Sequence, residues 1–163
     1  MYKKLPDDFS LLCDLRTSRP ALLSSEILRM VKYSILCSKY KIYYDENGMP
    51  MGYFAWADVN AETLLRIHRA GIFPRYIYEW EEGDIRLFVD GLLLGTRRLP
   101  LWRSLVAEAL GNALQVAFIK RGKVRYYVKD IARFSARPLT RLDATTLNER
   151  AVCETLSDSS LSK

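Results

Sequence analysis

Residues 82–90 read EGDIRLFVD, and the glycine-bounded run GLLLG follows them. The apolar stretch before Asp90 predicts a strand, because it is short, rich in β-formers and bounded by glycines. Aspartate is depleted in strands, so a strand that ends on Asp90 needs a partner or a function for that carboxylate. We therefore expect Asp90 to end a central strand with its carboxylate facing a cleft. A turn or capping role before Gly91 is the alternative.

Local signals outward from this strand alternate between helices and strands. They predict a short helix from Asp7 to before Pro20, a helix from Ser24 or Ser25 to about Ser38, strands at 40–44 and 51–57 joined by a turn at 45–48, a helix from Asn60 that ends by Gly71 and Pro74, a strand at 85–90, a helix from Leu99 to about Gly111, and strands at 115–120 and 124–128 joined at 121–123. This order predicts an α/β (α+β) fold, with a mixed β-sheet flanked by helices. We expect one domain over residues 1–135 and a C-terminal extension over 136–163, partly helical and then disordered.

Composition limits the class of protein. With 163 residues, of which 49% are hydrophobic, the chain is long enough for one domain with a core. The net charge of +6 favours acidic partners, such as nucleic acid, anionic lipid or an acidic carrier protein. Three scattered cysteines and one histidine predict neither a metal site nor a disulfide framework. No run reaches the roughly 18 apolar residues of a membrane span and no signal peptide is visible, so we expect a cytoplasmic chain with no membrane span.

Two short motifs carry a resemblance to a known family. Residues 50–57 read PMGYFAWA, and the GD pair at 83–84 precedes Phe88 and Asp90. In this order and separation they resemble the RTX toxin-activating lysine acyltransferases (hemolysin-activating acyltransferases), over about residues 40–128. These enzymes move a fatty acyl group from acyl carrier protein to internal lysines of a protein toxin. The resemblance implies a GNAT-like sheet, no metal and no bound cofactor, because the carrier supplies the acyl-phosphopantetheine.

The resemblance also implies roles for particular residues. Asp90 matches the catalytic aspartate of the family. An acyl or substrate channel would be lined by Tyr53, Trp56 and Phe88. The excess positive charge provides carrier-protein binding, which we assign to Arg97, Arg98 and Arg121. The expected partners are acyl carrier protein and a protein toxin, and the sequence leaves open whether the chain forms a homodimer.

The chain departs from the family at the catalytic histidine. The family histidine falls shortly after the position of Pro20, where this chain reads ALLS over residues 21–24. General-base assistance contributes roughly 100- to 10,000-fold, so we expect acyl transfer that is slow but not abolished. The only histidine, His68, is interpreted as a partly exposed helix residue rather than a replacement base. Cys13 and Cys37 lie in apolar helical settings and are interpreted as packing residues rather than nucleophiles.

Two other functions stay open. Because the histidine is missing, the alternative is a non-catalytic relative that binds carrier protein or toxin. The basic and aromatic residues at 120–127 are typical of a hairpin that binds single-stranded nucleic acid. That function is the less favoured, because the chain has no RNP-like or helix-turn-helix motif, and we expect no nucleic acid among its partners.

Overall fold

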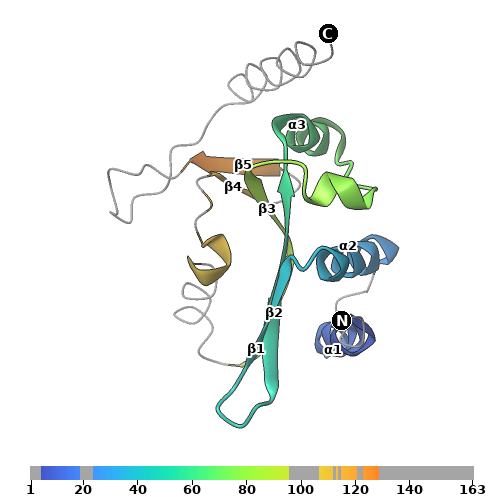
Figure 1. The fold of residues 1–163 in the computed structure, drawn as a ribbon, viewed down its shortest axis with the longest axis vertical. Coiled ribbons are helices and arrows are strands. Elements are labelled where there is room, and N and C mark those ends of the chain that lie inside the picture. The colour runs from blue at the N-terminus through green and yellow to red at the C-terminus, as the bar shows by residue number, and fades with distance from the viewer. Residues whose placement is uncertain are drawn as a thin grey trace. The chain divides into compact units, whose positions relative to one another are not determined.

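The computed structural model describes residues 5–18, 24–95, 107–111, 113, 115–120 and 123–128. The elements are α1 (Leu5–Thr17), α2 (Ser25–Leu36), β1 (Tyr40–Tyr44), β2 (Pro50–Val59), α3 (Ala61–Ala70), the 3₁₀ turn η1 (Ile77–Trp80), β3 (Ile85–Leu93), β4 (Gln115–Lys120) and β5 (Lys123–Val128) (Figure 1). Residues 107–110 are also helical. The predicted helices and strands that fall in the described part of the chain are therefore confirmed, while η1 is an element that the sequence did not predict.

The five strands form one sheet in the order β1-β2-β3-β4-β5. The pairs β1·β2 and β4·β5 are antiparallel. The side chain of Gln115, the first residue of β4, donates a hydrogen bond to Asp84, which lies directly before the first residue of β3. The neighbouring strands β3 and β4 therefore begin at the same end of the sheet. The result is a mixed sheet flanked by helices, the α+β class expected from the sequence.

The chain divides into two compact units, and the division passes through β2 and β3. The first unit comprises Met1–Ala57 with Phe88–Gly111, and the second comprises Asp58–Leu87 with Asn112–Lys163. Each unit is described on its own below.

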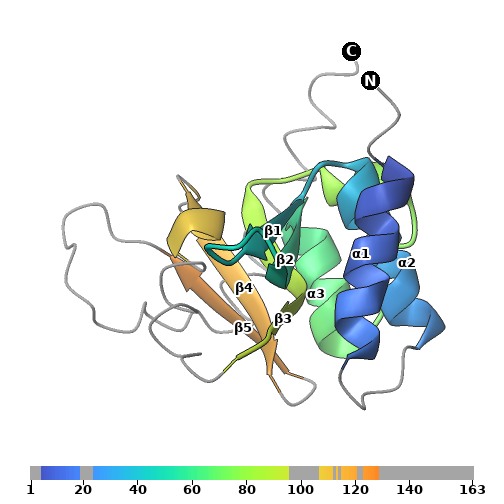
Figure 2. The same ribbon diagram turned by 90° about the horizontal axis from the view of Figure 1, so that it is seen from below.

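In the first unit, α1 and α2 lie side by side and pack on the sheet (Figures 1 and 2). Ser24 caps α2 by accepting a hydrogen bond from the N–H of Ile27, as its position in the sequence predicted. The core consists of Leu12 and Leu15 from α1, Val31 and Ile35 from α2, Tyr53 and Ala55 from β2, and Leu92 from β3. This core fixes α1 against the strands that carry Tyr53 and Asp90.

The hairpin between β1 and β2 turns at Gly48, whose φ of 76° requires a residue that tolerates the left-handed region. Gly52 has a different reason to be glycine. A Cβ built there would lie 2.3 Å from the carbonyl oxygen of Leu92, so β2 and β3 approach too closely for any side chain. The glycine of the PMGY motif thus brings Tyr53 next to β3.

In the second unit, α3 begins at the cap Asn60, which accepts from the N–H of Thr63, and ends at Gly71 with φ 66°. Both ends were predicted. The helix packs against β5, and the buried residues of this unit include Leu64, Trp80, Ile85, Leu87, Val116 and Tyr126. Gly83 has no room for a Cβ, which would lie 2.2 Å from the carbonyl oxygen of Val59.

The main correction concerns β3. The strand was predicted to end at Asp90, but it continues through Gly91 to Leu93. Backbone pairing explains the difference, because the N–H of Leu94 still bonds the carbonyl of Met51 and keeps the two strands together beyond the aspartate. Asp90 therefore lies inside a central strand rather than at its end. The extension 136–163 and most of the helix predicted from Leu99 lie outside the described residues.

Candidate functional site

Asp90 lies at the centre of a polar cluster in the first unit. Its Oδ2 accepts a hydrogen bond from the hydroxyl of Tyr53 on β2, and its Oδ1 lies 3.3 Å from Nη2 of Arg16 on α1. Only 10% of the Asp90 side chain and 16% of the Arg16 side chain are exposed. Three elements remote in sequence thus converge on one carboxylate, which has a partner on each oxygen. A partner or function for Asp90 was expected, and the partners are Tyr53 and Arg16.

The environment of Tyr53 keeps its hydroxyl protonated. Burial raises the pKa of Tyr53, and the charge of Asp90 and the hydrogen bond to it raise that pKa further, while Arg16 opposes them. A phenol in this state donates a proton to a hydrogen bond and is a poor base at neutral pH. The chemistry of the cluster therefore centres on the carboxylate, with Tyr53 and Arg16 holding it in one orientation.

Arg16 was not predicted as a site residue. Its only sequence signal is its position in the last turn of α1, where a cation is favourable on any helix. Its Nε is buried and has no hydrogen-bond partner among the described residues. Burial of a guanidinium on a carboxylate from another element is a tertiary feature, so sequence spacing alone could not find it.

The residues predicted to line a channel are all placed by the structure. Tyr53 is fully buried, while Trp56 and Phe88 are partly buried. Phe88 packs edge to face on Phe54, with ring centroids 5.3 Å apart. Tyr53 donates the hydrogen bond to Asp90 described above. The predicted channel remains a prediction.

Other predicted residues fall elsewhere. Arg97, Arg98 and Arg121 lie outside the described residues, as do positions 19–23, where the family histidine was expected. His68 is exposed on α3 and belongs to the second unit. Burial and the neighbouring Asp14 raise the pKa of the Cys13 thiol, which disfavours the thiolate that a nucleophile needs.

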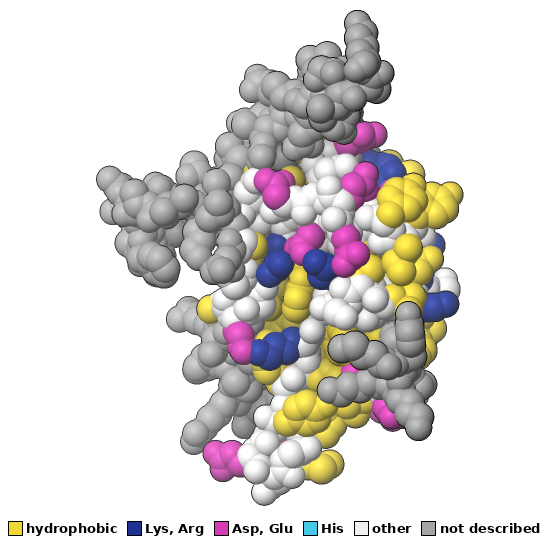
Figure 3. Space-filling model, in the orientation of Figure 1, with side chains coloured by type: hydrophobic (Ala, Val, Ile, Leu, Met, Phe, Trp, Pro, Cys, Tyr) yellow, Lys and Arg dark blue, Asp and Glu magenta, His cyan; other side chains and the backbone are white. Residues whose placement is uncertain are grey.

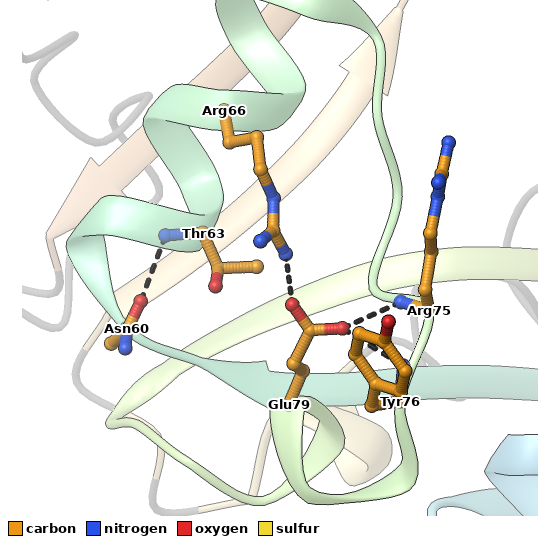
Figure 4. Close-up of polar contacts among 6 residues, drawn as sticks. All are labelled: Asn60, Thr63, Arg66, Arg75, Tyr76 and Glu79. Carbon is orange, nitrogen blue, oxygen red and sulfur yellow. Dashed lines mark hydrogen bonds and ion pairs between the residues drawn. The ribbon is translucent and has the colours of Figure 1, made fainter.

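A second buried carboxylate, Glu79, belongs to an acidic stretch of the sequence with Glu81, Glu82 and Asp84. Its Oε2 accepts from the N–H groups of Arg75, at 2.6 Å, and Tyr76, at 2.8 Å, and its Oε1 pairs with the guanidinium of Arg66 (Figure 4). Burial opposes the ionisation of Glu79, but these contacts outweigh it and lower its pKa. Glu79 therefore serves as a charged cap for the turn that enters η1.

Among the described residues, no three His, Cys, Asp or Glu side chains come together in a way that would hold a metal ion. None of the described helices is both long and apolar enough to cross a membrane. What the first unit offers is an oriented, mostly buried carboxylate, which can accept a hydrogen bond or a proton from an amine.

Comparison with protein-family models gives no match to this chain, and comparison with curated protein sequences gives none either.

Proposed function

We propose that the chain is a protein-lysine acyltransferase, similar to the RTX toxin-activating enzymes, that moves a fatty acyl group from acyl carrier protein to an internal lysine of a protein toxin. The observation that carries this proposal is the Asp90 carboxylate, held by Tyr53 and Arg16 at the position where the resemblance puts the catalytic aspartate. Gly52 and Gly83, both part of the resembling motifs, have no room for a side chain, which gives those motifs a physical reason.

The reaction requires that a lysine amine lose a proton. The amine nitrogen attacks the thioester carbonyl, a C–N bond forms, and the C–S bond breaks as the phosphopantetheine sulfur leaves and is protonated. A lysine is charged at neutral pH, so a group at the site must take the proton of its ammonium or orient it for transfer to water. Asp90 is that group in this proposal. Tyr53 and Arg16 are positioning residues, because they act on Asp90 and not on the acyl group.

The same geometry predicts a slow enzyme. Both oxygens of Asp90 already have partners, so the carboxylate must share or release a contact when it meets the amine. The family histidine is absent from residues 21–24. Alignment of thioester and amine remains as a source of rate acceleration.

The engaged carboxylate also favours a second candidate, a non-catalytic relative that binds carrier protein or toxin. In that protein the cluster of Asp90, Tyr53 and Arg16 would only fasten α1 to the sheet. The two candidates differ in one measurable respect, which is release of the carrier thiol.

The remaining expectations belong to this proposal. The GNAT-like form of the sheet would hold the pantetheine arm. The reaction would take place in the cytoplasm, where acyl carrier protein is loaded with its acyl group. No cofactor of the enzyme's own is needed, because the carrier supplies the activated acyl group.

The test uses the full chain, acyl carrier protein loaded with a fatty acid, and a protein toxin encoded beside its gene. We expect slow release of the phosphopantetheine thiol, and added acyl mass on the toxin by intact-mass spectrometry, both lost in Asp90→Asn. Asp7→Asn, at an exposed aspartate of α1, is the matched control and should retain both signals. Absence of thiol release and of acyl mass with the wild-type chain would leave the non-catalytic relative as the function.

A further inference from the structure

The second unit carries a group of exposed apolar side chains on the turn η1. Tyr76, Ile77 and Tyr78 are 60%, 48% and 63% exposed. The rings of Tyr76 and Tyr78 stack on each other with their planes 4° apart and their centroids 5.6 Å apart. Hydrophobic side chains lie at the surface on the right of Figure 3, where η1 is drawn in Figure 1. We call Tyr76, Ile77 and Tyr78 the tyrosine surface.

The backbone that presents the tyrosine surface is held at both ends. Glu79 caps the turn at its start, as described above (Figure 4). At its end the N–H of Glu81 donates to the carbonyl of Tyr78, and Glu81 forms a β-bridge with Asp58. A surface whose backbone is ordered in the free protein loses less conformational entropy on binding. Exposed and clustered apolar side chains on such a backbone are typical of an interaction surface.

The charges around the tyrosine surface are of both signs. Residues 62–84 hold five carboxylates and three arginines, and one of each is already used in the pair of Glu79 and Arg66. A partner with a uniformly acidic face would be repelled by Glu81, and one with a uniformly basic face would be repelled by Arg75. The surface therefore fits a partner that itself carries both signs.

The two charges lie at opposite ends of η1. Arg75 comes before the turn, and its exposed side chain points away from Glu79 (Figure 4). Glu81 comes after the turn and is exposed. Since a 3₁₀ turn has about three residues per turn, Glu81 lies on the same side as Tyr78. Among the described residues, the side chains of Arg75 and Glu81 form no ion pair.

This arrangement is complementary to itself. In a dimer with two-fold symmetry, a residue i of one copy contacts residue j of the other, and j contacts i in return. When two η1 turns lie antiparallel across a two-fold axis, Arg75 of each copy meets Glu81 of the other. The tyrosine surfaces of the two copies then pack between the charged ends. An apolar centre that contains tyrosine, with a polar rim, is the usual composition of a protein interface.

We propose that the tyrosine surface is the centre of a two-fold interface between two copies of this chain, with Arg75 of each copy paired with Glu81 of the other. Stable interfaces bury about 800 Å² on each partner, so an interface centred on one turn forms a reversible dimer. We expect its dissociation constant to lie at about 1–100 µM. The interface is independent of Asp90 and of the proposed reaction.

The first test is sedimentation velocity of the full chain from about 1 to about 200 µM. The mass should rise from the 18.9 kDa of one chain towards twice that value. Tyr76→Ser with Tyr78→Ser should raise the dissociation constant of the dimer at least about tenfold. The matched control is Tyr44→Ser, which removes an exposed tyrosine of β1 and should leave the constant within about twofold. Circular dichroism melting confirms that each variant is folded.

The second test exchanges the charges. Arg75→Glu alone and Glu81→Arg alone each put like charges together at both ends of the interface, so each should weaken the dimer at least about tenfold. An equimolar mixture of the two variants should dimerise within about threefold of the wild type, because each end then joins a carboxylate of one copy to a guanidinium of the other. The matched controls are Lys32→Glu and Glu46→Arg, at exposed charges of the first unit, which should each dimerise alone like the wild type.

Three results would overturn the proposal. The first is a wild-type chain that stays monomeric up to about 200 µM. The second is a dimer that the tyrosine substitutions do not weaken. The third is a mixture of the two charge variants that stays as monomeric as each variant alone, because a two-fold interface must bring their opposite charges together. All three are measured as mass, so they do not depend on whether the chain transfers an acyl group.

Discussion

Asp90 and Glu79 are both nearly buried carboxylates that pair with an arginine, yet they are built in different ways. Glu79 finds its partners close by in the chain, at Arg75 and Tyr76 on the turn it caps and at Arg66 on the preceding helix. Asp90 has no such local partners. Its contacts come from Tyr53, which is 37 positions away, and from Arg16 in the first helix.

The difference separates a structural role from a candidate site. A carboxylate that accepts from the N–H groups of its own turn is explained by folding, since it supplies those groups with an acceptor. The contacts described for Asp90 are instead with two side chains, those of Tyr53 and Arg16. The three side chains of the Asp90 cluster come from remote elements, so the needs of a turn do not explain them; the catalytic role that we propose and the fastening of α1 to the sheet are the two alternatives.

Removal of the Asp90 charge is the strongest test of this distinction. Asp90→Asn should lower kcat for acyl transfer about 100-fold or more, because the amide keeps the shape but accepts no proton. Glu79→Gln should leave kcat within about twofold of the wild-type value, because Glu79 acts only on the turn. An effect of this substitution on activity is expected in KM. Thiol release at saturating carrier, corrected for folded protein, measures both. An equal loss of kcat in the two variants would contradict the assignment of a catalytic role to Asp90 and a structural role to Glu79.

The complementary test concerns stability. Glu79→Gln should lower the free energy of unfolding by about 2 kcal/mol, because two backbone N–H groups and Arg66 lose a charged acceptor. The pKa of Glu79 is lowered from its ordinary value of 4.5, so this stabilisation is present above that value and disappears as the pH falls through the lower pKa of the folded state. Urea unfolding at pH 7 and at decreasing pH measures the effect.

The matched control is Glu82→Gln, at an exposed glutamate, which should change stability by less than about 0.5 kcal/mol. A wild-type advantage over Glu79→Gln that stays constant down to the lowest pH at which the chain folds would contradict the capping role.

Arg16 provides a finer test, because it separates positioning from mere packing. Arg16→Met keeps most of the side-chain volume but removes the charge beside Asp90, and we expect kcat to fall about tenfold. Arg16→Lys should recover part of that loss, since it restores a cation without the planar guanidinium. The kcat values of the wild type and the two variants are compared, and we expect KM for the carrier to be the same in all three. Equal kcat values for Arg16→Met and Arg16→Lys would show that Arg16 has a packing role alone.

The smallest expected effect is spectroscopic. Asp90 is one of the causes that raise the pKa of Tyr53, so Asp90→Asn should let Tyr53 ionise at lower pH than in the wild type. Ring-labelled tyrosine followed by NMR through a pH titration reports this, with Tyr53→Phe identifying the signal. Glu79→Gln should leave the Tyr53 titration unchanged. If Tyr53 begins to ionise at the same pH in wild type and in Asp90→Asn, below the pH at which either unfolds, the two groups do not interact in solution.

The sequence by itself determined the local elements of this protein. The caps Ser24 and Asn60, the turn at Gly48 and the helix end at Gly71 were all predicted, because capping and turn chemistry act over a few residues. The sequence also singled out Asp90, since a charged residue after an apolar run is unfavourable without a partner.

Only the tertiary structure decided what surrounds that residue. The continuation of β3 beyond Asp90 depends on pairing with β2, which local propensity does not report. Arg16 gave the ordinary signal of a helix C-terminus, and Glu79 gave no signal beyond its place in an acidic stretch, yet each lies in a cluster with an oppositely charged side chain. Such contacts arise when separate elements pack, because the ion pair forms only after burial has brought together groups that no sequence spacing relates.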